Sequence, residues 1–373
     1  MERGLFNICT PAEGGGVYAE KIYLFFTVLT ASMHMRKRFI IYYFFFIIYY
    51  SQFVWEKVGV NLDLVLGYCR ENNIEYKENE LMSKHTSFKI GGAAKLIVIP
   101  KTKEEISGII KECNKSKIKY YIIGKGSNLL VSDSGLDCVV ILLNNNFAKI
   151  KFTHGVIDDT SLVHTHNAHG IIEAEAGASL SSVCNFALEN SLSKMEFAWG
   201  IPGTIGGAAY MNAGAYGGEM KDVIIKCEHI DNNGNFGEIS GEDLKLSYRK
   251  SIYSESNFCI TKVFMRLTYD KKETIKAKMD DFMLRRKTKQ PLEYPSAGSV
   301  FKRPPGHFAG ALIEECGLKG HSINGAKVSE KHAGFIINTG NATCSDVNQL
   351  IKEIQQKVYD KFKINLETEL INK

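Results

Sequence analysis

The chain has 373 residues, of which 45% are hydrophobic and 23% charged, and its net charge is +5. These values are ordinary for a globular protein of two or three domains, and the interspersed lysines and glutamates form no basic stripe that would indicate nucleic-acid binding. The nine cysteines include no C-x-x-C pair. They therefore predict reduced, buried thiols in a cytoplasmic protein, and neither a disulfide framework nor a metal site.

The first 55 residues differ in composition from the rest of the chain. The uncharged run at residues 39–54 follows the basic cluster Arg36-Lys37-Arg38. It is shorter than the ~20 residues that a spanning helix needs, and no small-residue cleavage site of a signal peptide is visible. Three interpretations stay open: a start site assigned too far upstream, a membrane anchor, and a signal sequence. We expect the folded part of the chain to begin near Glu56.

In the first half of the remaining chain, apolar periodicity predicts helices over residues 62–71 and 103–116. It predicts strands over residues 95–100, 120–123 and 139–143. The segment 151–170 holds His154, His164, His166 and His169. No acidic or cysteine partner stands at metal-ligand spacing, so this segment is interpreted as an exposed hairpin and not as a metal site.

In the second half, the pattern predicts a strand over 171–176 and a helix over 180–189. Strands over 224–230 and 258–269 are expected in one sheet, joined through a turn at Asn232-Asn233-Gly234. The basic helix expected over 274–288 is interpreted as one that exposes its charged face to solvent. A last helix is expected to begin at Ser345 as N-cap and to bury an apolar stripe over 347–362, before a final strand over 365–371. These elements predict an α+β fold.

Two glycine segments carry the strongest functional signal. The first, Gly124-Lys125-Gly126-Ser127-Asn128-Leu129, follows an apolar strand as a phosphate cradle does, although it has neither P-loop nor dinucleotide-fingerprint spacing. The second, residues 199–220, alternates small residues with specific large ones. Such a composition favours backbone packed closely against a ligand over a flexible linker. Together they predict one long ligand held at two places.

Six motifs, in order along the chain, resemble the UDP-N-acetylenolpyruvoylglucosamine reductase family, bacterial flavoenzymes of peptidoglycan precursor synthesis. They are HTSFKIGGAA, IIGKGSNLLVSD, GIPGTIGGAAYMNAGAYGGE, LSYRKSIY, AGSVFKRP and GAKVSEKHAGFIINTGNAT, and the resemblance covers about residues 56–373. It implies an FAD-binding domain of the vanillyl-alcohol oxidase/p-cresol methylhydroxylase type over 56–270, with subdomains of about 56–124 and 125–270. A C-terminal α+β substrate-binding domain is implied over 271–373, with its last strand returning toward the active site.

The resemblance implies non-covalent FAD, NADPH as co-substrate, a UDP-sugar substrate and no metal. We expect a cytoplasmic monomer that binds no nucleic acid and meets a membrane only if residues 1–55 are an anchor. The FAD-binding residues implied lie in the two glycine segments: Gly124, Lys125, Gly126, Ser127, Asn128, Leu129, Gly200, Ile201, Pro202, Gly203, Thr204, Gly206, Gly207, Asn212, Gly214 and Ala215.

The resemblance also assigns the catalytic roles. Ser299 matches the serine that protonates the enolate left by hydride transfer, Arg249 matches the arginine that stabilises it, and Glu369 matches the family carboxylate. Glu367 is the rival for the last role, because it would share a strand face with Glu369. For the substrate, the resemblance implies Lys302, Arg303 and Tyr248.

Two residues depart from the family pattern. Arg303 stands where asparagine is usual, which predicts altered substrate affinity, and Asn324 stands where glycine is usual. Asparagine tolerates positive φ better than most residues, so the turn is expected to survive. The short segment between Tyr248 and Thr268 indicates the subclass without a tyrosine-loop insertion, with a more open substrate channel.

Two alternative functions remain: a flavin oxidase of the same fold acting on another sugar or alcohol, and a non-catalytic flavin protein tethered to a membrane.

Overall fold

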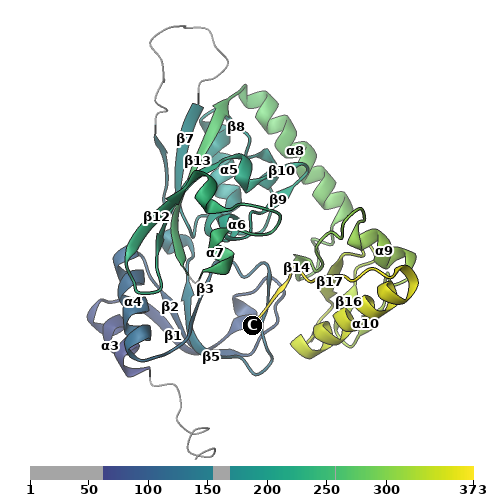
Figure 1. Cartoon of the computed structure of the whole chain (residues 1–373), viewed down its shortest axis with the longest axis horizontal. Coiled ribbons are helices and arrows are strands. Elements are labelled where there is room, and N and C mark those ends of the chain that lie inside the picture. Colours follow the sequence, from purple (N-terminus) through teal and green to yellow (C-terminus); the bar gives the residue numbers. More distant parts are fainter. Residues whose placement is uncertain (1–61, 154–168, 257) are drawn as a thin grey trace, which may run out of the picture. The chain divides into compact units, whose positions relative to one another are not determined.

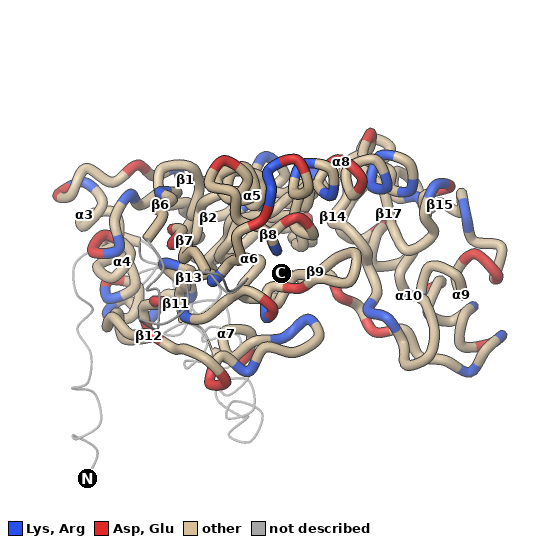
Figure 2. Tube along the Cα trace, turned by 90° about the horizontal axis from the view of Figure 1, so that it is seen from above, with Lys and Arg blue, Asp and Glu red and all other residues tan. Residues whose placement is uncertain are grey.

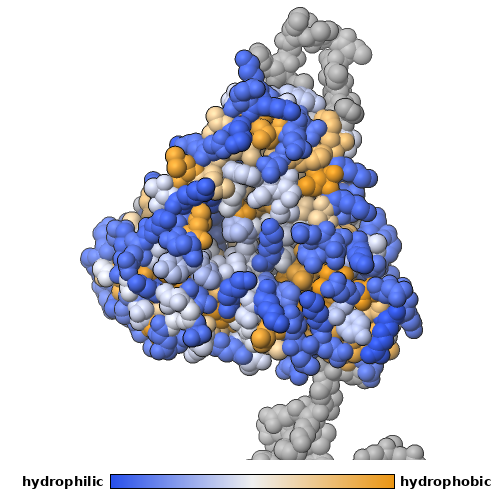
Figure 3. All heavy atoms as spheres, turned by 180° about the vertical axis from the view of Figure 1, so that it is seen from behind, coloured by the Kyte–Doolittle hydropathy of each residue, from blue (hydrophilic) through white to orange (hydrophobic). Residues whose placement is uncertain are grey.

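The computed structural model describes residues 62–153, 169–256 and 258–373. The expectations for residues 1–55 and for His154, His164 and His166 lie outside these residues. Within them, Lys and Arg are interspersed with Asp and Glu along the trace (Figure 2). Exposed apolar side chains lie in small groups between hydrophilic ones on the face drawn in Figure 3. No helix in the described ranges combines the length and the apolar character needed to cross a membrane.

The first sheet carries the loop that later forms part of the site. Its order is β1 (Glu75–Leu81), β2 (Ala93–Ile99), β5 (Leu136–Leu142) and β3 (Tyr120–Ile123), with β2, β5 and β3 parallel (Figure 1). Helices α3 (Asp63–Glu71) and α4 (Lys103–Lys115) contact each other. The predicted helices and strands of this region are confirmed within a few residues. The first glycine segment leaves the sheet at the carboxyl end of β3, where ligands of parallel sheets commonly bind.

The second sheet is antiparallel, in the order β12 (Phe236–Ser240), β11 (Ile224–Ile230), β13 (Cys259–Tyr269), β7 (His169–Glu175) and β6 (Ile150–Thr153). Helix α5 (Leu180–Glu189) and strand β11 have the predicted bounds. The predicted connection is wrong, because the turn at Asn232–Gly234 joins β11 to β12 and not to β13. Strand β12 was missed because it lies at the sheet edge, where its residues are exposed or only half-buried and its apolar pattern is weak.

A third sheet lies in the C-terminal part, in the order β14 (Ser296–Ser299), β17 (Phe335–Asn338), β16 (Ala326–Val328) and β15 (Ser322–Ile323). It is reached through the long helix α8 (Lys272–Lys289), and helices α9 (Ala309–Glu315) and α10 (Cys344–Phe362) accompany it. The predicted N-cap Ser345 of α10 is wrong. Thr343 is the N-cap, because its hydroxyl accepts from the Asp346 N–H while the Asp346 carboxylate accepts from the Thr343 N–H.

The C-terminal segment returns to the first glycine segment. Strand β18 (Ile371–Asn372) pairs in parallel with β4 (Leu129–Leu130), directly after the first glycine loop. The predicted strand over 365–371 is wrong in extent, since only a single bridge, between Phe301 and Thr368, precedes β18 in that stretch. The segment is pinned by separate contacts to two different elements and so does not form one ladder.

Candidate active site

The two glycine segments meet in space. A Cβ added to Gly124 would lie 2.3 Å from Thr204 Oγ1, and one added to Gly203 would lie 3.6 Å from Ser127 Oγ. Thr204 is the N-cap of the short helix α6 (Ile205–Tyr210), and its hydroxyl accepts from the Gly207 N–H at 3.3 Å. The first segment therefore packs against the start of α6 at a distance that only glycine allows.

The first glycine segment offers free donors. Among the described residues, no hydrogen bond reaches the backbone N–H groups of Lys125, Gly126, Ser127 or Asn128. Gly126 has φ +58, and a Cβ there would lie 2.3 Å from the His85 carbonyl oxygen. Consecutive unpaired N–H groups in a tight loop form a concavity that binds phosphate oxygens. These residues fit the diphosphate of FAD.

Asn212 stabilises the second glycine segment from inside. Its side chain is fully buried, and its amide nitrogen donates to Glu219 Oε2 at 2.7 Å and to the Ser247 carbonyl at 2.9 Å. Its amide oxygen accepts from the Lys221 N–H at 2.8 Å. The side chain predicted to contact the cofactor is thus engaged with protein groups, and it shapes the segment that ends in β9 (Gly214–Ala215).

Arg249 lies on a strained turn docked on that segment. Ser247 and Lys250 exchange both backbone hydrogen bonds at 3.0 Å, and Arg249 between them has φ 57, which is uncommon for a non-glycine residue. Its Nη2 donates weakly to the Gly214 carbonyl at 3.4 Å. The guanidinium also lies 5.2 Å from the centre of the Tyr248 ring. The turn therefore aims Arg249 at the second glycine segment.

Arg249 and Glu369 form a largely buried ion pair. Arg249 Nε lies 2.6 Å from Glu369 Oε1, and the two side chains are 20% and 13% exposed. The Nε–H makes no well-directed hydrogen bond, so the contact is mainly a charge contact. Burial raises the pKa of Glu369, and the positive charge of Arg249 opposes that shift. The rival Glu367 is 76% exposed and pairs with Lys302 at 3.2 Å, so the geometry favours Glu369.

The backbone links Glu369 to the strand that carries Ser299. The Glu369 N–H donates to the Val300 carbonyl at 2.7 Å, one residue beyond Ser299 at the end of β14. Gly298 has φ +76 and open space where a side chain would stand. Asn128 of the first glycine segment donates its amide to the Glu369 carbonyl at 3.0 Å. Residues from three distant parts of the sequence therefore converge here.

The predicted substrate residues border this centre. The Arg303 N–H donates to Tyr248 Oη at 3.1 Å, and the Arg303 guanidinium lies 4.7 Å from the centre of the Phe308 ring. Tyr248 is 49% exposed and so remains accessible to a ligand. Asn324, the other departure from the family pattern, has φ 46 and donates to Asp346 Oδ1 at 2.7 Å. The turn it was expected to preserve is present.

Two residues that the sequence did not single out support this arrangement. Asp133 accepts from the Cys344 N–H at 2.7 Å and from the Ser345 N–H at 3.0 Å, which ties the stretch after β4 to the start of α10. Arg286 of α8 is buried against the second glycine segment. An aspartate after a glycine loop and an arginine in a basic helix carry no local signal that would have identified either role.

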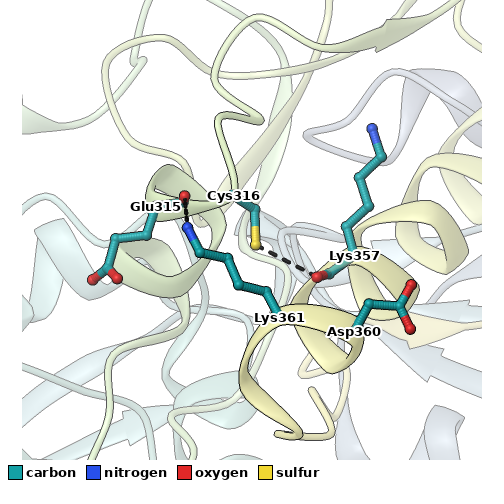
Figure 4. A pocket seen from close by; sticks show the side chains of 5 residues that line it. All are labelled: Glu315, Cys316, Lys357, Asp360 and Lys361. Carbon is teal, nitrogen blue, oxygen red and sulfur yellow. Dashed lines mark hydrogen bonds between the residues drawn. The ribbon is translucent and has the colours of Figure 1, made fainter.

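A separate shallow surface depression of about 380 Å³ lies between the ends of α9 and α10. It is lined by Glu315, Cys316, Lys357, Asp360 and Lys361, and the Cys316 thiol donates to the Lys357 carbonyl at 3.6 Å (Figure 4). Lys361 donates to the Glu315 carbonyl. None of these residues belongs to the predicted site, and burial raises the pKa of Cys316, which disfavours a reactive thiolate.

Comparison with known proteins covers both halves of the site. Residues 94–240, which include both glycine segments, match the model of an FAD binding domain. Residues 290–372, which include Ser299 and Glu369, match the model of the UDP-N-acetylenolpyruvoylglucosamine reductase C-terminal domain. Arg249 lies between the two matched regions. The predicted α+β fold with a flavin domain is confirmed.

Similar proteins carry the same name. A UDP-N-acetylenolpyruvoylglucosamine reductase of Caldanaerobacter subterraneus is 49% identical over 292 residues, which are 78% of this chain and 91% of the relative. Its counterpart in Alkaliphilus metalliredigens is 48% identical over 291 residues, with the same coverage. The crystal structure of UDP-N-acetylenolpyruvylglucosamine reductase from Thermus caldophilus matches with a TM-score of 0.65 and 32% identity, over 80% of this chain and 98% of that one.

Proposed function

The chain belongs to the UDP-N-acetylenolpyruvoylglucosamine reductase family, and we propose that it reduces UDP-N-acetylenolpyruvoylglucosamine to UDP-N-acetylmuramate with NADPH. It is an FAD-containing oxidoreductase of peptidoglycan precursor synthesis. The observation that best supports the proposed reaction is the Arg249–Glu369 pair, bonded through the backbone to the strand of Ser299 and through Asn128 to the first glycine segment.

When bound, FAD supplies the hydride that adds to the methylene carbon of the enol ether. The residues of the chain then stabilise and protonate the negative charge that this addition leaves on the substrate. Arg249 presents a planar cation to the substrate carboxylate and so stabilises the enolate. Ser299 donates its hydroxyl proton to the carbon that bears the carboxylate. A serine hydroxyl is a weak acid, and it is competent here because the enolate is strongly basic.

Glu369 holds the Arg249 guanidinium in place and can share a proton with the enolate. Its raised pKa means that it takes up a proton more readily than an exposed glutamate, and Arg249 keeps it from being fully neutralised. Lys302, Arg303 and Tyr248 border the centre and offer two cations and a phenol to the diphosphate and sugar of the substrate. We propose that FAD is held without a covalent bond, that NADPH is the reductant, and that the enzyme is a cytoplasmic monomer.

The runner-up is an FAD-dependent oxidase of a sugar or alcohol. An oxidase needs a base that removes a proton from the substrate, and it has no use for a proton donor beside a carbanion. The turn that carries Arg249 and the open space beside Gly298, next to Ser299, favour the reductase. A non-catalytic flavin protein would not need the buried Arg249–Glu369 pair, which is costly to place inside a protein.

The Ser299→Ala variant tests the proposal. NADPH oxidation by the bound flavin should stay within twofold of the wild type, because Ser299 plays no part in that half-reaction. Product formation should fall by more than the ~10²–10⁴-fold typical of a general acid, because Ser299 is the group that we assign to protonate the carbon, whereas Glu369 is engaged in the ion pair with Arg249. Stopped-flow absorbance of the flavin separates the two half-reactions.

Ser296→Ala on the same strand is the matched control. Ser296 accepts a hydrogen bond from Ser87 through its backbone oxygen, which alanine retains. Both half-reactions of this variant should be close to those of the wild type. An equal loss of the two half-reactions in Ser299→Ala would show that Ser299 is structural and would remove the proton-donor role from the proposal.

A further inference from the structure

Arg286 is a buried cation in a helix that otherwise presents charged residues to solvent. Only 5% of the residue is exposed. Its contacts are two carbonyl oxygens and an aromatic ring. Burying a guanidinium against uncharged groups costs free energy unless those groups are held where they satisfy it. The identity of these groups therefore indicates what the residue is for.

The first contact is with the start of the second glycine segment. Arg286 Nε donates to the Trp199 carbonyl at 3.1 Å, and Nη2 donates weakly to the Phe197 carbonyl at 3.4 Å. Gly200 follows with φ +80, and a Cβ there would lie 2.8 Å from Met283 Cε and 3.0 Å from Arg286 Cδ. Helix α8 thus packs directly on the turn that opens the segment.

The second contact is with the other end of the segment, where α8 passes beside β9 and β10 (Gly218–Glu219) (Figure 1). The guanidinium of Arg286 lies 5.0 Å from the centre of the Tyr216 ring. That ring also stacks on Phe282 of α8, with centroids 4.8 Å apart and planes 8° from parallel. Tyr216 has φ 53, a conformation that neighbouring contacts must stabilise. It follows Ala215 directly.

We propose that Arg286 is a positioning residue for the flavin. It holds the turn at 197–200 and the ring of Tyr216 at the same time, and thereby fixes the glycine-rich backbone between them in the form that accepts FAD. The inference rests on FAD as cofactor and not on the identity of the sugar substrate, so it can fail while the proposed reaction stands.

The test is the dissociation constant of FAD, measured from the fluorescence of flavin released when the holoenzyme is diluted. Arg286→Met should raise this constant about tenfold or more, because charge-assisted bonds to two carbonyls are lost. Arg286→Lys should recover part of the affinity, since an ammonium keeps the cation and one hydrogen bond. Lys276→Met on the same helix is the matched control. Lys276 is half-exposed and pairs with Asp280, and its loss should change the constant less than twofold.

Two further measurements distinguish positioning from a general loss of stability. Tyr216→Leu removes the ring from the same contact at a residue that is 36% exposed, and it should weaken FAD binding even if Arg286→Met does not fold. The midpoint of thermal unfolding of the flavin-free protein should stay close to that of the wild type in Tyr216→Leu and Arg286→Lys, because flavin-bound protein would unfold at a lower temperature through weaker FAD binding alone. Unchanged FAD affinity in Arg286→Met, or a fall in unfolding temperature with no rescue by lysine, would overturn the proposal.

Discussion

Glu369 carries its charge where little water reaches it. Its side chain is 13% exposed, and burial raises its pKa although Arg249 lies within ion-pair distance. A carboxylate so placed is expected to lower the stability of the folded state at neutral pH, which fits the catalytic role that we propose for Glu369. The same residue therefore connects the chemistry of the site to a measurable dependence of stability on pH.

We expect Glu369→Gln to become more stable relative to the wild type as pH rises above 4.5, the ordinary pKa of a glutamate. The folded-state pKa of Glu369 lies above its ordinary value of 4.5, so the folded wild type binds more protons than the unfolded chain between the two values. The free energy of unfolding of the wild type then falls as pH rises through that window. Glutamine does not titrate and lacks this dependence. Urea unfolding across the pH range measures the difference.

Glu367→Gln is the control for that experiment. Glu367 stands two residues away and is 76% exposed, so its substitution should leave the pH dependence of stability close to that of the wild type. The same pair of variants separates the catalytic assignments, because Glu369→Gln should slow flavin reoxidation by substrate and Glu367→Gln should not. Equal pH profiles for the two variants would contradict the burial argument.

At the scale of elements, strand β18 connects the backbone near Glu369 to the first glycine segment. The Ile371 N–H donates to the Asn128 carbonyl at 3.0 Å, the Lys373 N–H to the Leu130 carbonyl at 2.9 Å, and the Ser132 N–H to the Lys373 carbonyl at 2.7 Å. Glu369 lies two residues before the start of this strand. The position of the carboxylate is therefore coupled to the position of the first glycine segment.

Deleting residues 371–373 should weaken FAD binding and slow flavin reoxidation by substrate, each by about tenfold or more. Three backbone hydrogen bonds are lost besides the one that the Asn372 side chain donates to Asn348, and each is worth ~0.5–1.5 kcal/mol. The control is Lys373→Ala, which keeps the backbone bonds and removes only the ammonium that lies 4.3 Å from the Tyr121 ring centre. Flavin fluorescence and stopped-flow absorbance give the two quantities. A deletion variant that behaves as Lys373→Ala does would show that β18 plays no part.

The elements that could be predicted from the sequence are those with a strong apolar period. Helix α4 buries Ile106, Ile109 and Ile110 on one face, as their spacing indicates. Strand β12 and helix α6 were not predicted, because β12 is a partly exposed edge strand and α6 is built largely from glycine and alanine. The C-terminal strand was drawn too long because an apolar pattern does not reveal which partner each residue bonds.

The site shows the same division. Local composition indicated that both glycine segments hold a ligand, and the family resemblance supplied Ser299, Arg249 and Glu369. The contact between Asn128 and Glu369 joins residues 241 positions apart, and no spacing rule reports such a bond. The buried state of Arg286 was hidden in a helix whose charged residues indicated a solvated face. Long-range contacts of polar side chains need the three-dimensional structure.

At the scale of the whole molecule, residues 60–373 form one structural unit, and all the contacts described above lie within it. We therefore predict that a variant lacking residues 1–55 binds FAD and turns over at least as fast as the full chain. The apolar run at 39–54 would be an exposed patch if left unpaired, and such patches promote aggregation or adsorption to membranes. Flavin content and turnover of the two chains test this. Loss of flavin on truncation would assign residues 1–55 a structural role.

The proposed reaction is tested most directly by mixing two components without oxygen. The flavin of the purified protein is first reduced with NADPH, and UDP-N-acetylenolpyruvoylglucosamine is then added while the flavin absorbance is followed. We predict rapid reoxidation of the flavin, with UDP-N-acetylmuramate formed in an amount equal to the flavin. Reduced flavin that persists with this substrate and reoxidises only when oxygen is admitted would contradict the reductase and favour an oxidase.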